Sequence, residues 1–186
     1  MRLDTLYKRN TNPKLYEDNR SSTNCGSFAL GVEGWYCPYI ENDDVDDELW
    51  QYTERERLLW IDELVQEGYS CEEIMSDITD RDFEFILKTC PWLEPIDEDQ
   101  VYDGGRVIAY RLSMEIPGER EEFDVDEYMD FHFRVLIDGE WWEKCGATEI
   151  RKVEDPDSEV WEVDDWLVYT GPIRYARFKE VTYDLV

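Results

Sequence analysis

Two short segments hold residues that could act together as a nucleophile and a base. Cys25 lies in NCGSFAL at 24–30, and His132, the only histidine, lies in DFHF at 130–133. A thiol at the start of a helix gains from the positive end of the helix dipole, which lowers its pKa and favours the thiolate. A histidine on a later strand could serve as its base, so the two segments predict a Cys–His pair.

The order of these segments resembles the papain-like and NlpC/P60-type thiol hydrolases, which place a cysteine on an early helix and a histidine on a strand of a following antiparallel sheet. The resemblance implies that Cys25 is the nucleophile and His132 the base. The third residue of such a site, which orients the imidazole, has no counterpart by motif. Glu140, Glu143 and Glu149 are candidates by their distance along the chain, and Glu143 completes the catalytic set if the protein is an enzyme.

The alternative interpretation makes Cys25 a small residue packed at a helix start and His132 a strand residue retained from an enzyme ancestor. Because no motif supplies an orienting group, we expect the two side chains to lie beyond hydrogen-bond reach or to meet without a third polar residue.

The segments NCGSFALGVEGWYCPY, DFHFRVLIDGEWWEKCG and TGPIRYARF are also similar to phage-borne proteins of Firmicutes.

Charge is the strongest feature of the composition. The 186 residues include 47 aspartates and glutamates but only 19 lysines and arginines, which leaves a formal net charge of −28 at pH 7. This balance would repel nucleic acid and anionic membranes, so neither is expected as a direct partner. A basic protein is the natural partner, although acidic residues also serve solubility alone.

The acidic residues are bunched, and aromatic side chains lie within or beside several of the runs at 41–48, 94–99, 119–127 and 154–165. Exposed carboxylates bind weakly one by one, so one or two aromatics should act as anchors, with core packing as their competing role. The expected contact residues are Asp43, Asp44, Asp46, Asp47, Glu48, Trp50, Glu121, Glu122, Asp124, Asp126, Glu127, Trp161, Asp164, Asp165 and Trp166.

A second resemblance combines the charge with the phage origin. The segments NPKLY, NCGSFALGVEGWY and RDFEFILKTCPWLEP are similar to small clostridial anti-CRISPR proteins that inhibit Cas9. This implies an inhibitor that binds guide-RNA-loaded Cas9 and impedes its engagement of target DNA. Cas9 holds nucleic acid in a positively charged channel and reads its PAM with arginines, so a compact acidic protein could compete for either surface. A DNA mimic directed at another basic host protein is the third hypothesis, beside the inhibitor and the hydrolase.

Other function classes receive no support. No apolar run approaches the roughly 20 residues of a membrane-spanning helix, and the first residues lack the apolar core of a signal peptide, so a protein of the host bacterial cytoplasm is expected. Five cysteines without a CxxC pair, together with one histidine, argue against structural zinc and a disulfide framework. No phosphate-binding glycine loop or calcium loop occurs, so no metal or cofactor is expected.

The first half of the chain has helical periodicity and the second half alternates. A short helix is expected near Cys25, the longest helix over 45–68, and two more over 71–78 and 80–89. Strands are expected over 105–116 and 130–137, the latter followed by an Asp138-Gly139 hairpin turn into a strand over 140–144. Further strands are expected over 160–163, 166–169 and 173–182. Helices followed by a mostly antiparallel sheet predict an α+β fold, with an extended arm over 1–23 and one domain over 24–186. The resemblance to thiol hydrolases implies a papain-like or NlpC-like arrangement of these elements.

Overall fold

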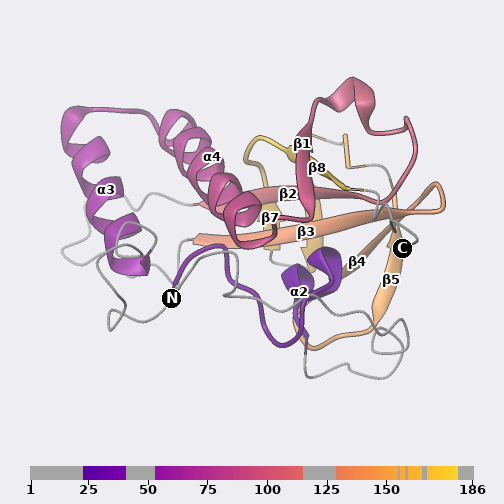
Figure 1. The fold of residues 1–186 in the computed structure, drawn as a ribbon. Helices are drawn as coiled ribbons and strands as arrows, with labels where there is room; N and C mark the ends of the chain where they lie inside the picture. Colours follow the sequence, from indigo (N-terminus) through magenta and orange to yellow (C-terminus); the bar gives the residue numbers. More distant parts are fainter. Residues whose placement is uncertain are drawn as a thin grey trace, which may run out of the picture.

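The structure is a computed structural model that describes residues 23–40, 53–114, 129–154, 156–157, 159–164 and 167–179. Helices come first along the chain and a mostly antiparallel sheet follows (Figure 1), so the predicted α+β class is confirmed. The expected arm, except Thr23, and the first part of the helix expected over 45–68 lie outside the described residues.

The helices begin and end at capping residues that the sequence supplies. Helix α2 spans Cys25–Leu30, α3 spans Glu54–Glu67 between a Thr53 cap and a left-handed Gly68, and α4 spans Cys71–Thr89. The expected break between 78 and 80 is wrong, because the Thr79 hydroxyl donates to the Met75 carbonyl one turn back and the helix continues. Helix α4 therefore has 19 residues. Helix α3, the described part of the helix expected over 45–68, has 14.

Six antiparallel strands form the main sheet, in the spatial order β1-β8-β2-β3-β4-β5, and β6 pairs with β7 in a separate hairpin. The hairpin turn between β3 and β4 is as predicted, since Asp138 and Gly139 both have positive φ, as a tight two-residue turn requires. The strands are β1 (Leu93–Ile96), β2 (Val107–Met114), β3 (Met129–Ile137), β4 (Glu140–Lys144), β5 (Ile150–Val153), β6 (Trp161–Asp164), β7 (Leu167–Tyr169) and β8 (Arg174–Phe178).

The two faces of the sheet pack against different layers. Alternation along β2 and β3 sends Tyr110 and Phe133 toward α2 and α4, where they join the larger apolar core. The residues next to them point to the opposite face, where Trp161 and Tyr169 of the β6–β7 hairpin close a second, smaller core. His132 lies on this second face, directly across from Arg111 in the register of β2 and β3.

A buried ion pair joins the helical layer to the sheet. The Arg57 guanidinium of α3 donates to the Asp82 carboxylate of α4 at 2.6 Å, and the Tyr110 hydroxyl of β2 donates to the same oxygen at 2.6 Å. Arg57 and Asp82 are 3% and 2% exposed. Burial raises the pKa of Asp82 and the charge of Arg57 opposes that rise, so the carboxylate depends on its partners.

Removing the Asp82 carboxylate should therefore be costly. We expect Asp82→Ala to lower the free energy of unfolding by about 3 to 5 kcal/mol, because Arg57 would remain buried and unpaired. Asp80→Ala is the matched control on the same helix, since its ion pair with Arg174 is solvent-exposed and should cost less than about 1 kcal/mol. Urea unfolding of both variants measures the difference, and equal losses would contradict the assignment.

Candidate functional site

The loop around α2 fixes the position of Cys25. The Asn24 side chain accepts from the Ser27 backbone N–H at 2.9 Å and caps the helix, and it also donates to the Tyr36 carbonyl at 2.7 Å. Gly26 lies so close to Tyr36 that a Cβ there would be 3.0 Å from its ring, so a larger residue would require the ring to shift. Cys25 is consequently the first residue of α2, as expected.

The Cys25 thiol is buried and protonated. Its sulfur donates to the Phe131 carbonyl at 3.8 Å, on the part of β3 that extends beyond the residues paired with β4. Burial raises the pKa of the thiol to about 12, the charge of Asp130 adds to the rise, and backbone hydrogen bonds from Phe133 and Gly26 do not offset it. The expectation that the helix start would lower the pKa of Cys25 is wrong, because desolvation outweighs the dipole of a six-residue helix.

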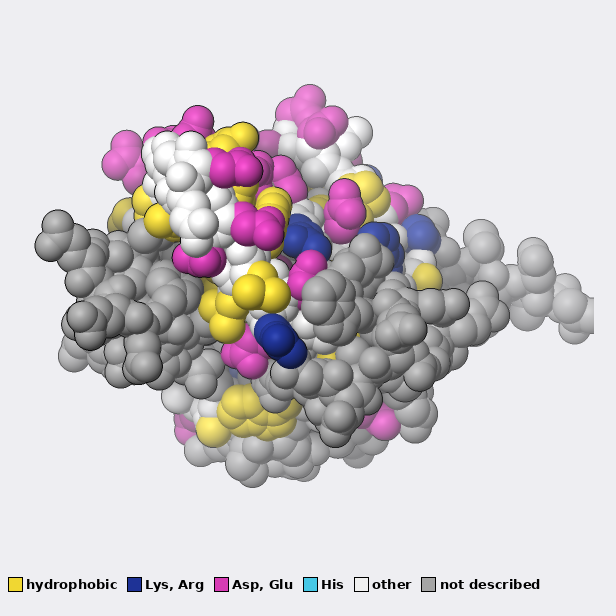
Figure 2. Space-filling model, turned by 90° about the vertical axis from the view of Figure 1, so that its left-hand side faces the viewer, with side chains coloured by type: hydrophobic (Ala, Val, Ile, Leu, Met, Phe, Trp, Pro, Cys, Tyr) yellow, Lys and Arg dark blue, Asp and Glu magenta, His cyan; other side chains and the backbone are white. Residues whose placement is uncertain are grey.

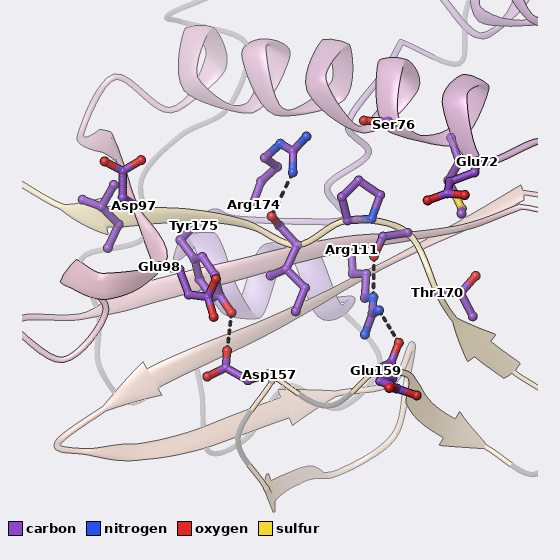
Figure 3. Close-up of a pocket in the computed structure, with 15 residues that line it drawn as sticks. Glu72, Ser76, Asp97, Glu98, Arg111, Asp157, Glu159, Thr170, Arg174 and Tyr175 are labelled. Carbon is purple, nitrogen blue, oxygen red and sulfur yellow. Dashed lines mark hydrogen bonds between the residues drawn. The ribbon is translucent and has the colours of Figure 1, made fainter.

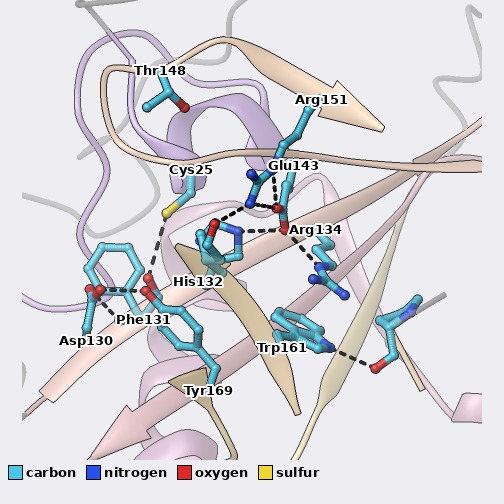
Figure 4. A network of polar contacts seen from close by, with 12 residues as sticks. Cys25, Asp130, Phe131, His132, Arg134, Glu143, Thr148, Arg151, Trp161 and Tyr169 are labelled. Atoms are coloured by element: carbon cyan, nitrogen blue, oxygen red, sulfur yellow. Dashed lines mark hydrogen bonds and ion pairs between the residues drawn. The ribbon is translucent and has the colours of Figure 1, made fainter. Parts of the chain in front are cut away.

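His132 has an orienting residue, and it is Glu143. The His132 Nε2 lies 3.2 Å from the Glu143 Oε2, with both side chains almost fully buried (Figure 4). Because an ionised carboxylate can only accept, Nε2 carries the proton and Nδ1 is the nitrogen left to act as a base when the ring is neutral. The other two sequence candidates do not serve this role: Glu140 pairs with Lys152, and Glu149 is exposed.

Two arginines that the sequence analysis did not single out share the Glu143 carboxylate. Arg134 donates from Nε to Oε2 at 2.9 Å, and Arg151 donates from Nε to Oε1 at 2.7 Å (Figure 4). Burial alone would raise the pKa of Glu143, but the hydrogen bond and charge of His132, with the two arginines, outweigh it and lower the pKa to about 2. Arg134 could have been found from the sequence, since it follows His132 by two residues and alternation places both on one face.

The cluster has the composition of a thiol site but not its connections. Cys25, His132 and Glu143 lie in one polar region (Figure 4), yet in the described part of the chain the thiol hydrogen bonds to the Phe131 carbonyl and not to the imidazole. His132 is 2% and Cys25 6% exposed, so neither is open to a substrate in this structure. The Tyr169 hydroxyl donates to Asp130 at 2.5 Å beside them, which closes the region with another protein group.

The expected contact residues have different outcomes. Trp161 is fully buried between the Arg111 and Arg134 guanidiniums and donates to the Pro156 carbonyl at 2.8 Å, so its assignment as an exposed anchor is wrong. Core packing is its role. The remaining expected contacts fall outside the described residues, except Asp164, which lies on β6 but whose side chain is not described.

A cavity of about 710 Å³ opens between the start of α4, η3 (Glu98–Gln100) and the start of β8 (Figure 3). The Arg111 guanidinium donates to the Gly171 carbonyl at 2.6 Å, and Arg174 pairs with Asp80. The arginines are thus held by groups of the protein itself. Five carboxylates complete the charged lining, and they make its character acidic: Glu72, Asp97, Glu98, Asp157 and Glu159.

The acidic character continues over the helical layer. Segment 53–103 holds sixteen carboxylates and four basic residues, and it includes α3, α4, β1 and η3. Acidic side chains spread over the face that α3 and α4 present in Figure 2. We use the name acidic face for the exposed carboxylates of this segment, which are Asp62, Glu63, Glu67, Glu72, Glu73, Asp77, Asp80, Glu84, Glu94, Asp97, Glu98, Asp99 and Asp103.

The comparisons with known proteins add no family. A scan against protein-family models, a search of curated proteins and a search of solved structures each found no match. Among the described residues, no three or more histidine, cysteine or carboxylate side chains are grouped so that they could hold a metal ion. Within the same residues, none of the helices combines the length and the apolar character needed to cross a membrane.

The lowered pKa of Glu143 predicts a pH dependence of stability. A glutamate in the unfolded chain has a pKa near 4.3, whereas in the folded protein the pKa of Glu143 is about 2. Its stabilising contribution is therefore complete above the unfolded pKa and is lost as the pH falls from about 4.5 through about 2.

We expect the wild type to lose on the order of 3 kcal/mol more than Glu143→Gln across this window, measured by urea unfolding at a series of pH values. Comparison with the variant removes the contribution of the many other carboxylates, which titrate in both proteins. Parallel pH profiles for the two proteins would show that Glu143 is not held by its three partners.

Proposed function

We propose that this protein acts by binding a basic, nucleic-acid-binding protein through its acidic face and blocking the access of nucleic acid to it. The observation that carries the proposal is the imbalance of exposed charge on segment 53–103. This segment has thirteen exposed carboxylates and only two exposed cations, Arg55 and Lys88. Such a surface attracts a cationic groove and speeds association with it. Guide-RNA-loaded Cas9 is the partner that the sequence resemblance implies, and inhibition of DNA engagement is the activity.

The shape of the acidic face supports the same proposal. Glu72 of α4 and Asp97 and Glu98 line the cavity of Figure 3 together with Arg111 and Arg174. Because the two arginines already have partners within the protein, these carboxylates offer partners to an arginine or lysine side chain that enters. Carboxylates can pair with a guanidinium through two parallel hydrogen bonds, which adds geometric selectivity to attraction. The basic residues Arg134 and Arg151 lie elsewhere, bound to Glu143 on the second face of the sheet.

A thiol hydrolase is the second candidate, and one observation favours it. The fold brings a cysteine at a helix start, a histidine and an orienting carboxylate into one region, in the chain order Cys25, His132, Glu143. Two observations weigh against it: the pKa of the thiol is raised to about 12, and the thiol bonds to a backbone carbonyl. A nucleophile needs thiolate character, and this environment suppresses it.

Neutralising part of the acidic face should weaken binding. In a competition assay between this protein and target DNA for guide-loaded Cas9, we expect the triple variant Glu63→Gln, Glu67→Gln, Asp77→Asn to associate several-fold more slowly, with a smaller change in dissociation. Binding by the wild type should weaken as salt rises, because exposed charges are screened within about 8 Å at 0.15 M. The salt slope should be shallower than that of duplex DNA, which also releases condensed counterions.

The control variant removes the same charge from exposed positions of the sheet region, through Glu149→Gln, Glu154→Gln and Glu162→Gln. If both variants slow association equally, net charge matters and the acidic face does not. If the wild type leaves DNA engagement by Cas9 unchanged, Cas9 is not the partner. Displacement of DNA from a restriction endonuclease or a nucleoid protein would then support the mimic of another basic protein.

Thiol labelling distinguishes the second candidate. We expect iodoacetamide to modify the exposed Cys71 well before the buried Cys25 in the native protein, because only the thiolate reacts and the pKa of Cys25 is high. Mass spectrometry after limited labelling gives the order. Preferential modification of Cys25, lost in His132→Ala, would instead show an activated nucleophile and favour the hydrolase; Cys71→Ser serves as the matched control.

A further inference from the structure

The outward side of α3 exposes large apolar side chains among its carboxylates. Leu59 is 47% exposed, Val65 41% and Tyr69, just after the helix, 45%. Hydrophobic side chains are visible among the acidic ones on this side of the molecule in Figure 2. Three of the seven exposed large apolar residues of the described chain therefore fall within eleven consecutive positions. Scattered exposed apolar residues are ordinary, but a group of them marks a contact surface.

Helical geometry separates this group from the buried side of α3. Ile61 and Leu64, spaced by three residues, pack into the core, as does Arg57. At 100° per residue, Leu59 points away from that buried side and Val65 lies on one flank. Tyr69 follows the left-handed Gly68, and its backbone N–H donates to the Leu64 carbonyl, which holds Tyr69 at the end of the helix.

Carboxylates lie between and beside the apolar residues. Asp62 lies between Leu59 and Val65 on the helix surface, and Glu63 and Glu67 follow the flank opposite Val65. Arg55 is the exposed cation of this helix, since Arg57 is buried in its ion pair with Asp82. The surface thus combines apolar contact area with a negative border, which complements a segment that has an apolar stripe and a positive border.

We propose that the outward side of α3 is the docking site for a basic amphipathic segment of the partner, with Leu59, Val65 and Tyr69 contacting its apolar side and Asp62, Glu63 and Glu67 its lysines or arginines. This inference rests on the proposed function and adds the anchor that charge alone does not provide, because exposed ion pairs contribute little each and buried apolar anchors carry most of the affinity of an interface. It replaces Trp161, which is in the core, as the apolar part of the contact surface.

The test uses three peptide probes and fluorescence anisotropy at constant salt. One peptide is helical, with leucines on one side and lysines on the other; the second has the same composition in a permuted order that has no apolar side; the third is oligolysine. We expect the wild type to bind the amphipathic peptide about tenfold more tightly than the permuted one. The variant Leu59→Gln, Val65→Gln, Tyr69→Gln should lose that preference and bind oligolysine as the wild type does.

A matched control keeps the result interpretable. Tyr102→Gln, Val160→Gln, Val168→Gln replaces three equally exposed apolar residues elsewhere, at 58%, 40% and 42% exposure, and should keep the preference. Circular dichroism and thermal melting establish whether both variants are folded. We expect both to fold, because the substituted side chains are exposed. Should the α3 variant fail to fold, the single change Leu59→Gln and protection of α3 amides from hydrogen exchange by the amphipathic peptide provide the same test.

The outcomes separate this inference from the function on which it rests. Binding of oligolysine without preference for the amphipathic peptide overturns the docking site and leaves the acidic binding function standing. Failure to bind any of the three basic probes contradicts the proposed function itself. Equal loss of preference in the control variant overturns the assignment to α3. If the wild type self-associates and the α3 variant does not, the surface binds a second copy of the chain, and the proposal of a basic partner segment is overturned.

Discussion

Glu143 lies on β4 with no exposure to solvent, and a carboxylate in such a place must have its lost hydration replaced by several partners. Those partners come from both neighbouring strands, His132 and Arg134 from β3 and Arg151 from β5. Arg151 also donates to the Val163 carbonyl of β6, so the same charge ties the small hairpin to the large sheet. A shift of β4 by one residue would turn Glu143 to the face of the sheet that packs against the helices. The network therefore fixes the register of β3, β4 and β5.

The same network holds the residue types of a thiol site in structural contacts. The carboxylate that orients His132 is shared with two guanidiniums, and Trp161 packs on one of them and closes the face. The Cys25 thiol donates to the Phe131 carbonyl, in the part of β3 that extends beyond its pairing with β4. The thiol and the Glu143 carboxylate thus both have structural partners, which favours the alternative interpretation that the sequence left open.

Periodicity was sufficient to predict the elements that have one apolar side. The alternation of Ile108, Tyr110 and Leu112 predicted β2, and Asp138-Gly139 predicted the following hairpin, because both patterns have a direct steric cause. The edge strands β1 and β5 were missed, since each has four residues and β1 contains Pro95, which reads as a loop among acidic residues.

The site was harder to predict because its chemistry depends on burial. Composition could place Cys25, His132 and Glu143 as candidates, but the pKa of the thiol follows from desolvation, which the sequence does not give. The burial of Trp161 could not be predicted from the sequence either. Its acidic neighbours along the chain suggested a surface anchor, whereas its neighbours in space are arginines that stack on its ring from the second face of the sheet.

Helix α3 is attached to the molecule much more lightly than α4. It buries three side chains over fourteen residues, and one of them is the charged Arg57, whereas α4 buries nine over nineteen. Regions with few buried contacts open locally at a lower free energy than the protein unfolds as a whole. We therefore expect α3 to open before α4 and the sheet, with loss of the Arg57–Asp82 pair. A ligand that binds the folded helix alone would slow this opening, and the motion of α3 would become a measure of occupancy.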